Sequence, residues 1–118
     1  MTSLGLSYCN LHDVDLLRIT DSLRLNSALN VKALIFRGNS LGDETATALV
    51  QVLRVKTAIS KIDLWGNSIG NDGAVALSKV LKLNSTIEFI NLGNNPIIKR
   101  TRASIKRESN NRIIFPTS

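Results

Sequence analysis

The stretch ISKIDLWGNSIG, from Ile59 to Gly70, is repeated along the 118-residue chain. It occurs upstream as VKALIFRGNSLG, from Val31 to Gly42, and downstream as IEFINLGNNPII, from Ile87 to Ile98. Equivalent apolar residues follow one another at intervals of 28 residues: Leu34, Ile62 and Ile90. Apolar and outward-facing residues alternate in each copy, which predicts a short strand with one buried face.

An earlier copy lies 30 residues before the second one: Leu4, Leu6, Cys9 and Leu11. All four copies read L-x-L-x-x-(N/C)-x-L, and the two extra residues fall between Leu29 and Leu34, where we expect a bulge. This pattern, with a helical second half in each repeat, resembles the leucine-rich repeat of the ribonuclease-inhibitor-like subclass. That subclass also occurs in Ran GTPase-activating proteins and in nucleotide-binding leucine-rich-repeat receptors.

The resemblance implies one α/β domain over residues 1–118: a short right-handed solenoid, with parallel strands on the concave side and helices on the convex side. Its repeats would span about residues 3–30, 31–58, 59–86 and 87–115. We expect Asp13, Asp43 and Asn71 or Asp72 to cap the helices that follow the strands. A row of residues at the strand-to-helix turns would satisfy buried backbone groups: Cys9, Asn39, Asn67 and Asn95.

The fourth repeat departs from this pattern and is expected to be a degenerate, basic capping repeat. Arg102 and Ser109 replace core residues, while Ile105 keeps one. A polar last helix fits the end of a solenoid because its outer side faces water, and Ile113 to Phe115 would cover the core. No comparable cap precedes Leu4, so that edge is either exposed, continued by neighbouring repeats of a longer array, or covered by another chain through self-association.

The formal net charge of the chain is +6, and most of it lies in residues 99–112, where six basic residues stand against Glu108. No apolar run approaches the roughly 18 residues of a transmembrane helix. The N-terminus lacks the basic and apolar segments of a secretory signal. A single cysteine cannot form an intramolecular disulfide, so we expect an intracellular, cytoplasmic setting.

The sequence gives little support for a catalytic site or a cofactor site. Cys9 and His12 are the single cysteine and the single histidine. Cys9 falls in the turn row and His12 at a turn position, and a metal would need a second strong ligand near His12. The run from Gly66 to Gly73 leads from strand to helix but lacks the Lys-Ser/Thr pair of a phosphate loop. We therefore expect no enzyme activity, no metal and no cofactor.

The basic C-terminal segment has two interpretations. It could contact the phosphates of nucleic acid or another anionic surface, or act as a nuclear-import signal, although it lacks interleaved aromatic residues for stacking on bases. Alternatively, it is a solvated capping helix whose bases near the C-terminus are favoured by the helix dipole. The residues that would meet an anion are Lys99, Arg100, Arg102, Lys106 and Arg107.

The outward side of the strands is the leading candidate for a binding surface. Side chains flanking the buried positions point away from the core and stack in rows from repeat to repeat. In one row Trp65 lies beside Arg37; both residue types are enriched in interface hot spots, although the ring could simply cover the arginine stem. The set assigned to a protein partner is Ile35, Arg37, Lys61, Asp63, Trp65, Phe89 and Asn91.

Three functional hypotheses follow. The first is a non-catalytic interaction module that binds a protein through the concave strand face. The second is association with nucleic acid or an anionic surface through the basic helix. A GTPase-regulator-like role is implied only by distant family resemblance, and no functional residue of that family can be matched in this sequence.

Overall fold

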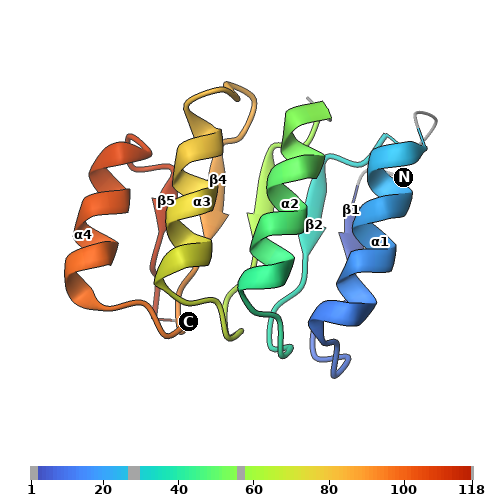
Figure 1. The fold of residues 1–118 in the computed structure, drawn as a ribbon, viewed down its shortest axis with the longest axis horizontal. Helices are drawn as coiled ribbons and strands as arrows, with labels where there is room; N and C mark the ends of the chain where they lie inside the picture. Colours follow the sequence, from blue (N-terminus) through green and yellow to red (C-terminus); the bar gives the residue numbers. More distant parts are fainter. Residues whose placement is uncertain (1–2, 27–29, 56–57, 118) are drawn as a thin grey trace.

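The computed structural model describes residues 3–26, 30–55 and 58–117. Five short strands and four helices alternate along these residues (Figure 1). The strands are β1 (Ser3–Gly5), β2 (Ala33–Ile35), β3 (Lys61–Asp63), β4 (Phe89–Asn91) and β5 (Ile113–Ile114). The helices are α1 (Asp13–Leu25), α2 (Asp43–Val55), α3 (Asn71–Leu81) and α4 (Lys99–Glu108). None of these described helices combines the length and the apolar character needed to span a membrane.

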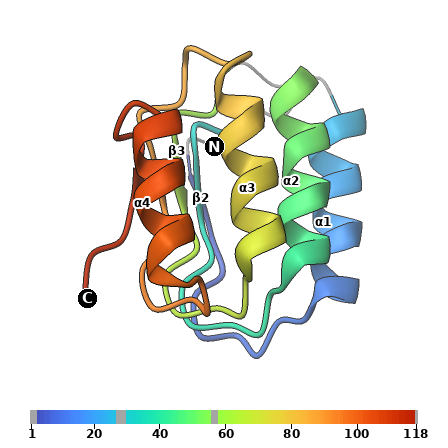
Figure 2. The same ribbon diagram turned by 60° about the vertical axis from the view of Figure 1, so that its left-hand side comes forward.

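All five strands pair in parallel in one sheet, in chain order from β1 to β5. The helices stand in the same order beside the sheet, so each repeat contributes one strand and one helix (Figures 1 and 2). The register keeps equivalent residues together, since Ala33 pairs with Lys61, and Lys61 pairs with Phe89. This arrangement confirms the predicted α/β solenoid and the predicted register that brings equivalent residues into rows.

The core lies between the sheet and the helices and is built mainly of aliphatic residues. The middle residue of each inner strand is fully buried, as in Leu34, Ile62 and Ile90. Helices α2 and α3 place apolar side chains at helical spacing against these strands. Buried Ala46 and Ala74 are small enough to let helix and strand approach closely. Each repeat therefore extends one continuous core.

The C-terminal residues close this core with a strand of their own. Ile113 and Ile114 form β5, which pairs with Ile90 and Asn91 of β4. Ile113 is fully buried, so this segment covers the core as predicted. The pairing itself was not predicted, because β5 follows β4 at an interval of 23 residues instead of 28. Ser109 is also fully buried despite its polarity, and its hydroxyl accepts a hydrogen bond from the Ile113 N–H (3.0 Å).

Carboxylates at the helix starts join neighbouring repeats. The sequence predicts Asp13 and Asp43 as N-caps of their own helices, but each is the first helical residue and its side chain reaches the next repeat. Asp13 Oδ1 accepts hydrogen bonds from the N–H groups of Gly42 (2.8 Å) and Thr45 (3.1 Å). Asp43 Oδ1 accepts one from the Gly70 N–H (2.7 Å). The two aspartates therefore cap the following helix, whose first N–H groups lack partners within the helix.

The N-terminal edge is packed less completely than the interior repeats. Leu4 and Leu6 are half-buried, whereas their counterparts Leu34 and Phe36 are fully buried. A neighbouring repeat or a second chain at this edge would bury the two leucines further. The bulge was predicted between Leu29 and Leu34; Leu29 lies outside the described residues, which resume at Asn30.

Candidate functional site

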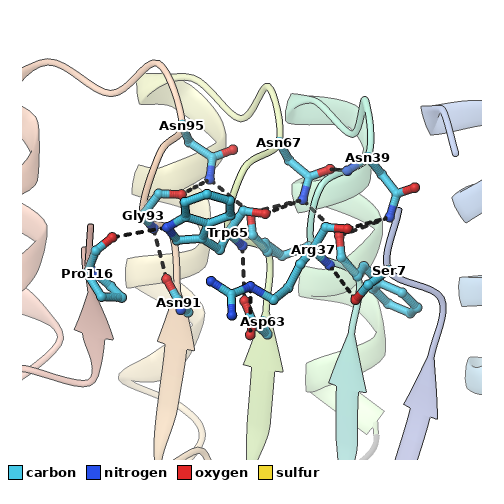
Figure 3. A network of polar contacts seen from close by, with 12 residues as sticks. Ser7, Arg37, Asn39, Asp63, Trp65, Asn67, Asn91, Gly93, Asn95 and Pro116 are labelled. Atoms are coloured by element: carbon cyan, nitrogen blue, oxygen red, sulfur yellow. Dashed lines mark hydrogen bonds and ion pairs between the residues drawn. The ribbon is translucent and has the colours of Figure 1, made fainter. Parts of the chain in front are cut away.

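The strand face is held in shape by a row of asparagine side chains where the strands end (Figure 3). In the middle of the row, Asn67 Oδ1 accepts hydrogen bonds from the N–H groups of Asn39 and Leu41 (both 3.2 Å). Its Nδ2 group donates to the carbonyl oxygens of Phe36 (2.9 Å) and Leu64 (3.0 Å). The buried Asn67 carboxamide thus joins two repeats and satisfies the backbone of both turns.

The row extends to both sides of Asn67. Asn39 Oδ1 accepts a hydrogen bond from the Cys9 N–H (3.0 Å), and Asn95 Oδ1 accepts one from the Ile69 N–H (2.9 Å). Cys9 stands at the exposed start of the row, in the first repeat. All four residues assigned to this row therefore lie at successive turns.

Three of the residues assigned to a partner meet on the strand face: Arg37, Asp63 and Trp65 (Figure 3). The guanidinium carbon of Arg37 lies 4.8 Å from the centroid of the Trp65 ring, a cation–π contact. Arg37 Nε lies 3.5 Å from Asp63 Oδ2, an ion pair, and Asp63 Oδ1 accepts a hydrogen bond from the Trp65 N–H (3.1 Å). The side chain of Asp63 is 14% exposed and that of Arg37 is 30% exposed, so solvent screens this pair less than a surface pair. We call these residues the Arg37–Asp63–Trp65 unit.

The edge of the Trp65 ring rests on the C-terminal segment. Trp65 Nε1 donates a hydrogen bond to the Pro116 carbonyl oxygen (3.2 Å). The ring also passes close to Gly93, where a β-carbon would lie 2.6 Å from Trp65 Cδ1 and would collide with the Pro116 oxygen. Glycine at this position leaves the room that the indole needs. Sequence reasoning missed Pro116 because it follows the last repeat and has no counterpart in the 28-residue register.

The other residues assigned to this face differ in their exposure. Lys61 is exposed, and its pairing partner Phe89 is half-buried, as is Ile35 on β2. Asn91 is only 7% exposed, and its Oδ1 accepts a hydrogen bond from the Gly93 N–H (3.0 Å). The Asn91 amide therefore serves the local backbone, whereas Lys61 faces solvent.

A cavity of about 450 Å³ opens beside Trp65, near the ends of strands β4 and β5. Its walls come from the loop after β4, from α4 and from the C-terminal segment. Trp65, Leu92, Phe115 and Pro116 supply apolar lining, and Arg102 is its charged member. Volumes of this size are typical of sites that hold a side chain or a small ligand. We call this cavity the Trp65 pocket.

Helix α4 carries all five residues assigned to anion contacts, and each is exposed: Lys99, Arg100, Arg102, Lys106 and Arg107. Three of them, Lys99, Arg100 and Arg102, lie within the first four residues of the helix, which include no acidic residue. The helix dipole disfavours cations at this end. The stabilising effect of the dipole that the sequence suggested therefore applies to Lys106 and Arg107 alone.

Two further basic residues near α4 contribute to structure. Lys82 Nζ lies 2.8 Å from Glu108 Oε2, and the Lys82 hydrogen bond and charge lower the pKa of Glu108 below its ordinary value. Arg112 Nη2 donates to the Leu81 carbonyl oxygen (2.6 Å), and its Nη1 donates to that of Asn84 (2.7 Å). Arg112 thus covers the C-terminal end of α3, where carbonyl groups lack partners within the helix.

The residues considered for catalysis occupy positions at the N-terminal end of the chain. His12 directly precedes α1, and its N–H donates to Asp15 Oδ2 (3.0 Å). Within the described ranges, no group of three or more histidine, cysteine, aspartate or glutamate residues is placed to hold a metal ion.

Comparison with solved structures identifies the fold. The 41 matching chains include one described as "Leiomodin-1 Actin-Binding Site 2 (ABS2)". That structure matches with a TM-score of 0.85 and 20% sequence identity, over 98% of this chain and 70% of that chain. At this identity the likeness shows the leucine-rich-repeat fold alone. No family model and no curated protein sequence matches the chain.

Proposed function

We propose that this leucine-rich-repeat chain is a non-catalytic interaction module that binds a protein partner through its strand face. The observation that carries the proposal is the Arg37–Asp63–Trp65 unit, which presents two residue types that dominate interface hot spots. Contacts to Arg37 and Pro116 already position the Trp65 ring. The ring would therefore lose little conformational freedom on binding, which favours affinity.

The fold comparison supplies a first partner to test. The leiomodin-1 structure is described as an actin-binding site, and we take actin as the first candidate partner for the strand face of this chain. An actin partner also agrees with the intracellular, cytoplasmic setting that the sequence suggests.

The test is a binding measurement with Trp65→Ala. Immobilised wild-type chain is exposed to purified actin and, separately, to cell extract, and the dissociation constant of each retained protein is then measured. Truncation of Trp65 is expected to weaken the binding of a strand-face partner by about 2 kcal/mol or more, which raises the dissociation constant roughly 30-fold. Circular dichroism should show an intact fold, because Trp65 lies on the outward side of the sheet.

Gln51→Ala is the matched control, since Gln51 is exposed on α2, away from the strand face. It is expected to bind every partner as the wild type does. Partners that Trp65→Ala and wild type retain with equal affinity would contradict the proposed function. Loss of actin binding in both variants would instead point to a different surface.

A second candidate function is association with an anionic surface through α4. It is favoured by Lys99, Arg100 and Arg102, which crowd the start of the helix against the preference of the helix dipole. Titration with duplex and single-stranded DNA at two salt concentrations tests it, because phosphate binding weakens steeply with salt. Absence of binding at low salt would remove this candidate.

Two weaker hypotheses complete the set. Self-association at the N-terminal edge is supported by the half-buried Leu4 and Leu6, and a stable monomer in sedimentation at high concentration would contradict it. The GTPase-regulator-like role is supported by the distant resemblance only, and a catalytic assay with a small GTPase would decide it.

A further inference from the structure

The Trp65 pocket and helix α4 together indicate the chemistry of the partner. We propose that the partner presents an acidic segment that carries one large apolar side chain. The apolar side chain enters the Trp65 pocket, and the flanking carboxylates meet Lys99, Arg102 and Lys106. This inference rests on the proposed protein-binding function and names the class of segment that is bound.

The pocket suits an apolar group. Its volume of about 450 Å³ and its walls of Trp65, Leu92, Phe115 and Pro116 would remove such a side chain from water. Two polar groups in these walls already have partners. Trp65 Nε1 donates to Pro116, and Asn95 Nδ2 donates to backbone carbonyl oxygens. An apolar occupant would therefore leave these two groups with their hydrogen bonds, and the other polar members of the walls are Asn94, Arg102 and Thr117.

Arg102 joins the pocket to the basic face of α4. It lines the pocket, and Lys99 and Lys106 stand three residues before it and four residues after it. Residues at these spacings lie on the same side of a helix. From Lys99 to Lys106 the helix rises about 10 Å, which an extended peptide covers with about three residues. Within the described part of the chain, none of these three cations forms an ion pair. The acidic residue of α4, Glu108, pairs with Lys82 instead.

The position of these charges on α4 favours the binding of an anionic partner. Lys99 and Arg102 lie at the positive end of the helix dipole, so each raises the free energy of the isolated helix. Carboxylates bound beside them would remove this repulsion and would also accept hydrogen bonds from the guanidinium and ammonium groups.

Carboxylates fit this surface better than nucleic acid does. Proteins that bind single strands place several aromatic rings along a basic groove, so that successive bases can stack. Here the guanidinium of Arg37 lies over the Trp65 ring, and the indole N–H is bonded to Pro116. Trp65 and Phe115 line one pocket instead of a series of platforms. The surface therefore offers one apolar anchor site beside a short row of cations.

The single tryptophan makes the pocket observable, because Trp65 emission responds to its own surroundings. The purified chain is titrated with three blocked peptides, EEDFEED, EEDSEED and KKRFKKR, and with a short DNA duplex. We expect EEDFEED to bind and to change Trp65 emission. EEDSEED should bind about tenfold more weakly or worse, because it lacks the apolar anchor. KKRFKKR should not bind.

Two matched charge reversals test the role of Arg102. Arg102→Glu and Arg100→Glu change the charge of the same helix equally, but residues two positions apart do not face the same side. Arg102→Glu is expected to weaken EEDFEED binding by about tenfold and Arg100→Glu by less than about threefold.

Equal binding of EEDFEED and EEDSEED, equal effects of the two reversals, or tighter binding of the duplex would overturn the inference. Failure of EEDFEED to bind would overturn it as well. A protein partner that needs Trp65 but tolerates Arg102→Glu would also overturn it, while leaving the proposed function intact. A partner that tolerates Trp65→Ala would contradict the proposed function itself.

Discussion

Arg112 makes, one repeat later, the contact that Asn84 makes. Asn84 Nδ2 donates to the Leu53 carbonyl oxygen (3.2 Å), and Arg112 Nη2 donates to the Leu81 carbonyl oxygen (2.6 Å). Donor and acceptor both move by 28 residues, so a forked cation takes the place of a carboxamide. The longer side chain also reaches the Asn84 carbonyl oxygen (2.7 Å). Both residues join the end of one helix to the following repeat, and Arg112 does so where the solenoid closes.

The substitution Arg112→Met should therefore destabilise the chain, because it leaves the Leu81 and Asn84 carbonyl groups without these donors. We expect the free energy of unfolding in urea to fall by about 2–4 kcal/mol. Arg112→Lys should recover part of this loss, since lysine keeps the charge but lacks the fork. The exposed Arg107→Met is the control and should change stability by about 0.5 kcal/mol or less. Equal urea midpoints for Arg112→Met and Arg107→Met would contradict the role of Arg112.

The asparagine row predicts a second stability effect. Asn67→Ala removes one carboxamide that bonds to Asn39, Leu41, Phe36 and Leu64. We expect a loss of about 2–4 kcal/mol in the free energy of unfolding, because buried backbone groups of two repeats lose partners. Thermal unfolding followed by circular dichroism measures the change.

Two comparisons make the Asn67 measurement decisive. At a pH where the new aspartate is protonated, Asn67→Asp keeps an acceptor oxygen and has one O–H donor in place of the two N–H donors, so its stability should lie between that of Asn67→Ala and that of the wild type. Ser68→Ala changes the exposed neighbouring residue and should leave the melting temperature almost unchanged. Equal melting temperatures for Asn67→Ala and Ser68→Ala would contradict the structural role of Asn67.

Features that repeat could be predicted from the sequence, because stacking turns a sequence interval into a spatial contact. The 28-residue interval places Leu34, Ile62 and Ile90 in adjacent strands, and the same register places Arg37 beside Trp65. The repeated strands and the centre of the candidate site could therefore be predicted from the spacing, and the resemblance to leucine-rich repeats implied the solenoid.

Features outside the register could not be predicted in this way. Pro116 approaches Trp65 across 51 residues, beyond the last repeat. The Asp13 carboxylate could have accepted a hydrogen bond from an N–H group of its own helix or from one of the next repeat. The side-chain rotamer decides between them, and in the structure the carboxylate accepts from Gly42. Asn91 was assigned to the outward row by alternation, but its short amide turns to the Gly93 N–H and is buried.

Gly93 should be essential for the position of the Trp65 ring against the C-terminal segment. In Gly93→Ala the new β-carbon would collide with Trp65 Cδ1 and with the Pro116 carbonyl oxygen. We expect the C-terminal segment to move away, the indole N–H to meet water, and Trp65 emission to shift to longer wavelength. Gly5→Ala is the matched control, because a β-carbon at Gly5 would meet no atom within 4 Å. Identical emission spectra for the two variants would show that the Trp65 ring does not depend on this space.

Glu108 should show a pH-dependent contribution whose sign follows from its pKa. The Lys82 hydrogen bond and charge, with smaller effects from Arg107 and Lys79, lower the pKa of Glu108 in the folded chain. The carboxylate form is therefore favoured by folding. Its stabilising contribution is present above the pKa of the unfolded chain and is lost as the pH falls through the lower pKa of the folded chain. Because Glu108 is exposed to solvent, salt should reduce the effect.

The measurement is an NMR titration of the Glu108 carboxyl carbon in wild type and in two lysine variants. Lys82→Met should raise the pKa of Glu108 toward its ordinary value, because it removes the hydrogen bond and the nearest charge. Lys79→Met removes an equal charge that acts more weakly and should raise the pKa less. High salt should narrow the difference between wild type and Lys82→Met. The same pKa in wild type and Lys82→Met would mean that the ion pair with Lys82 does not persist in solution.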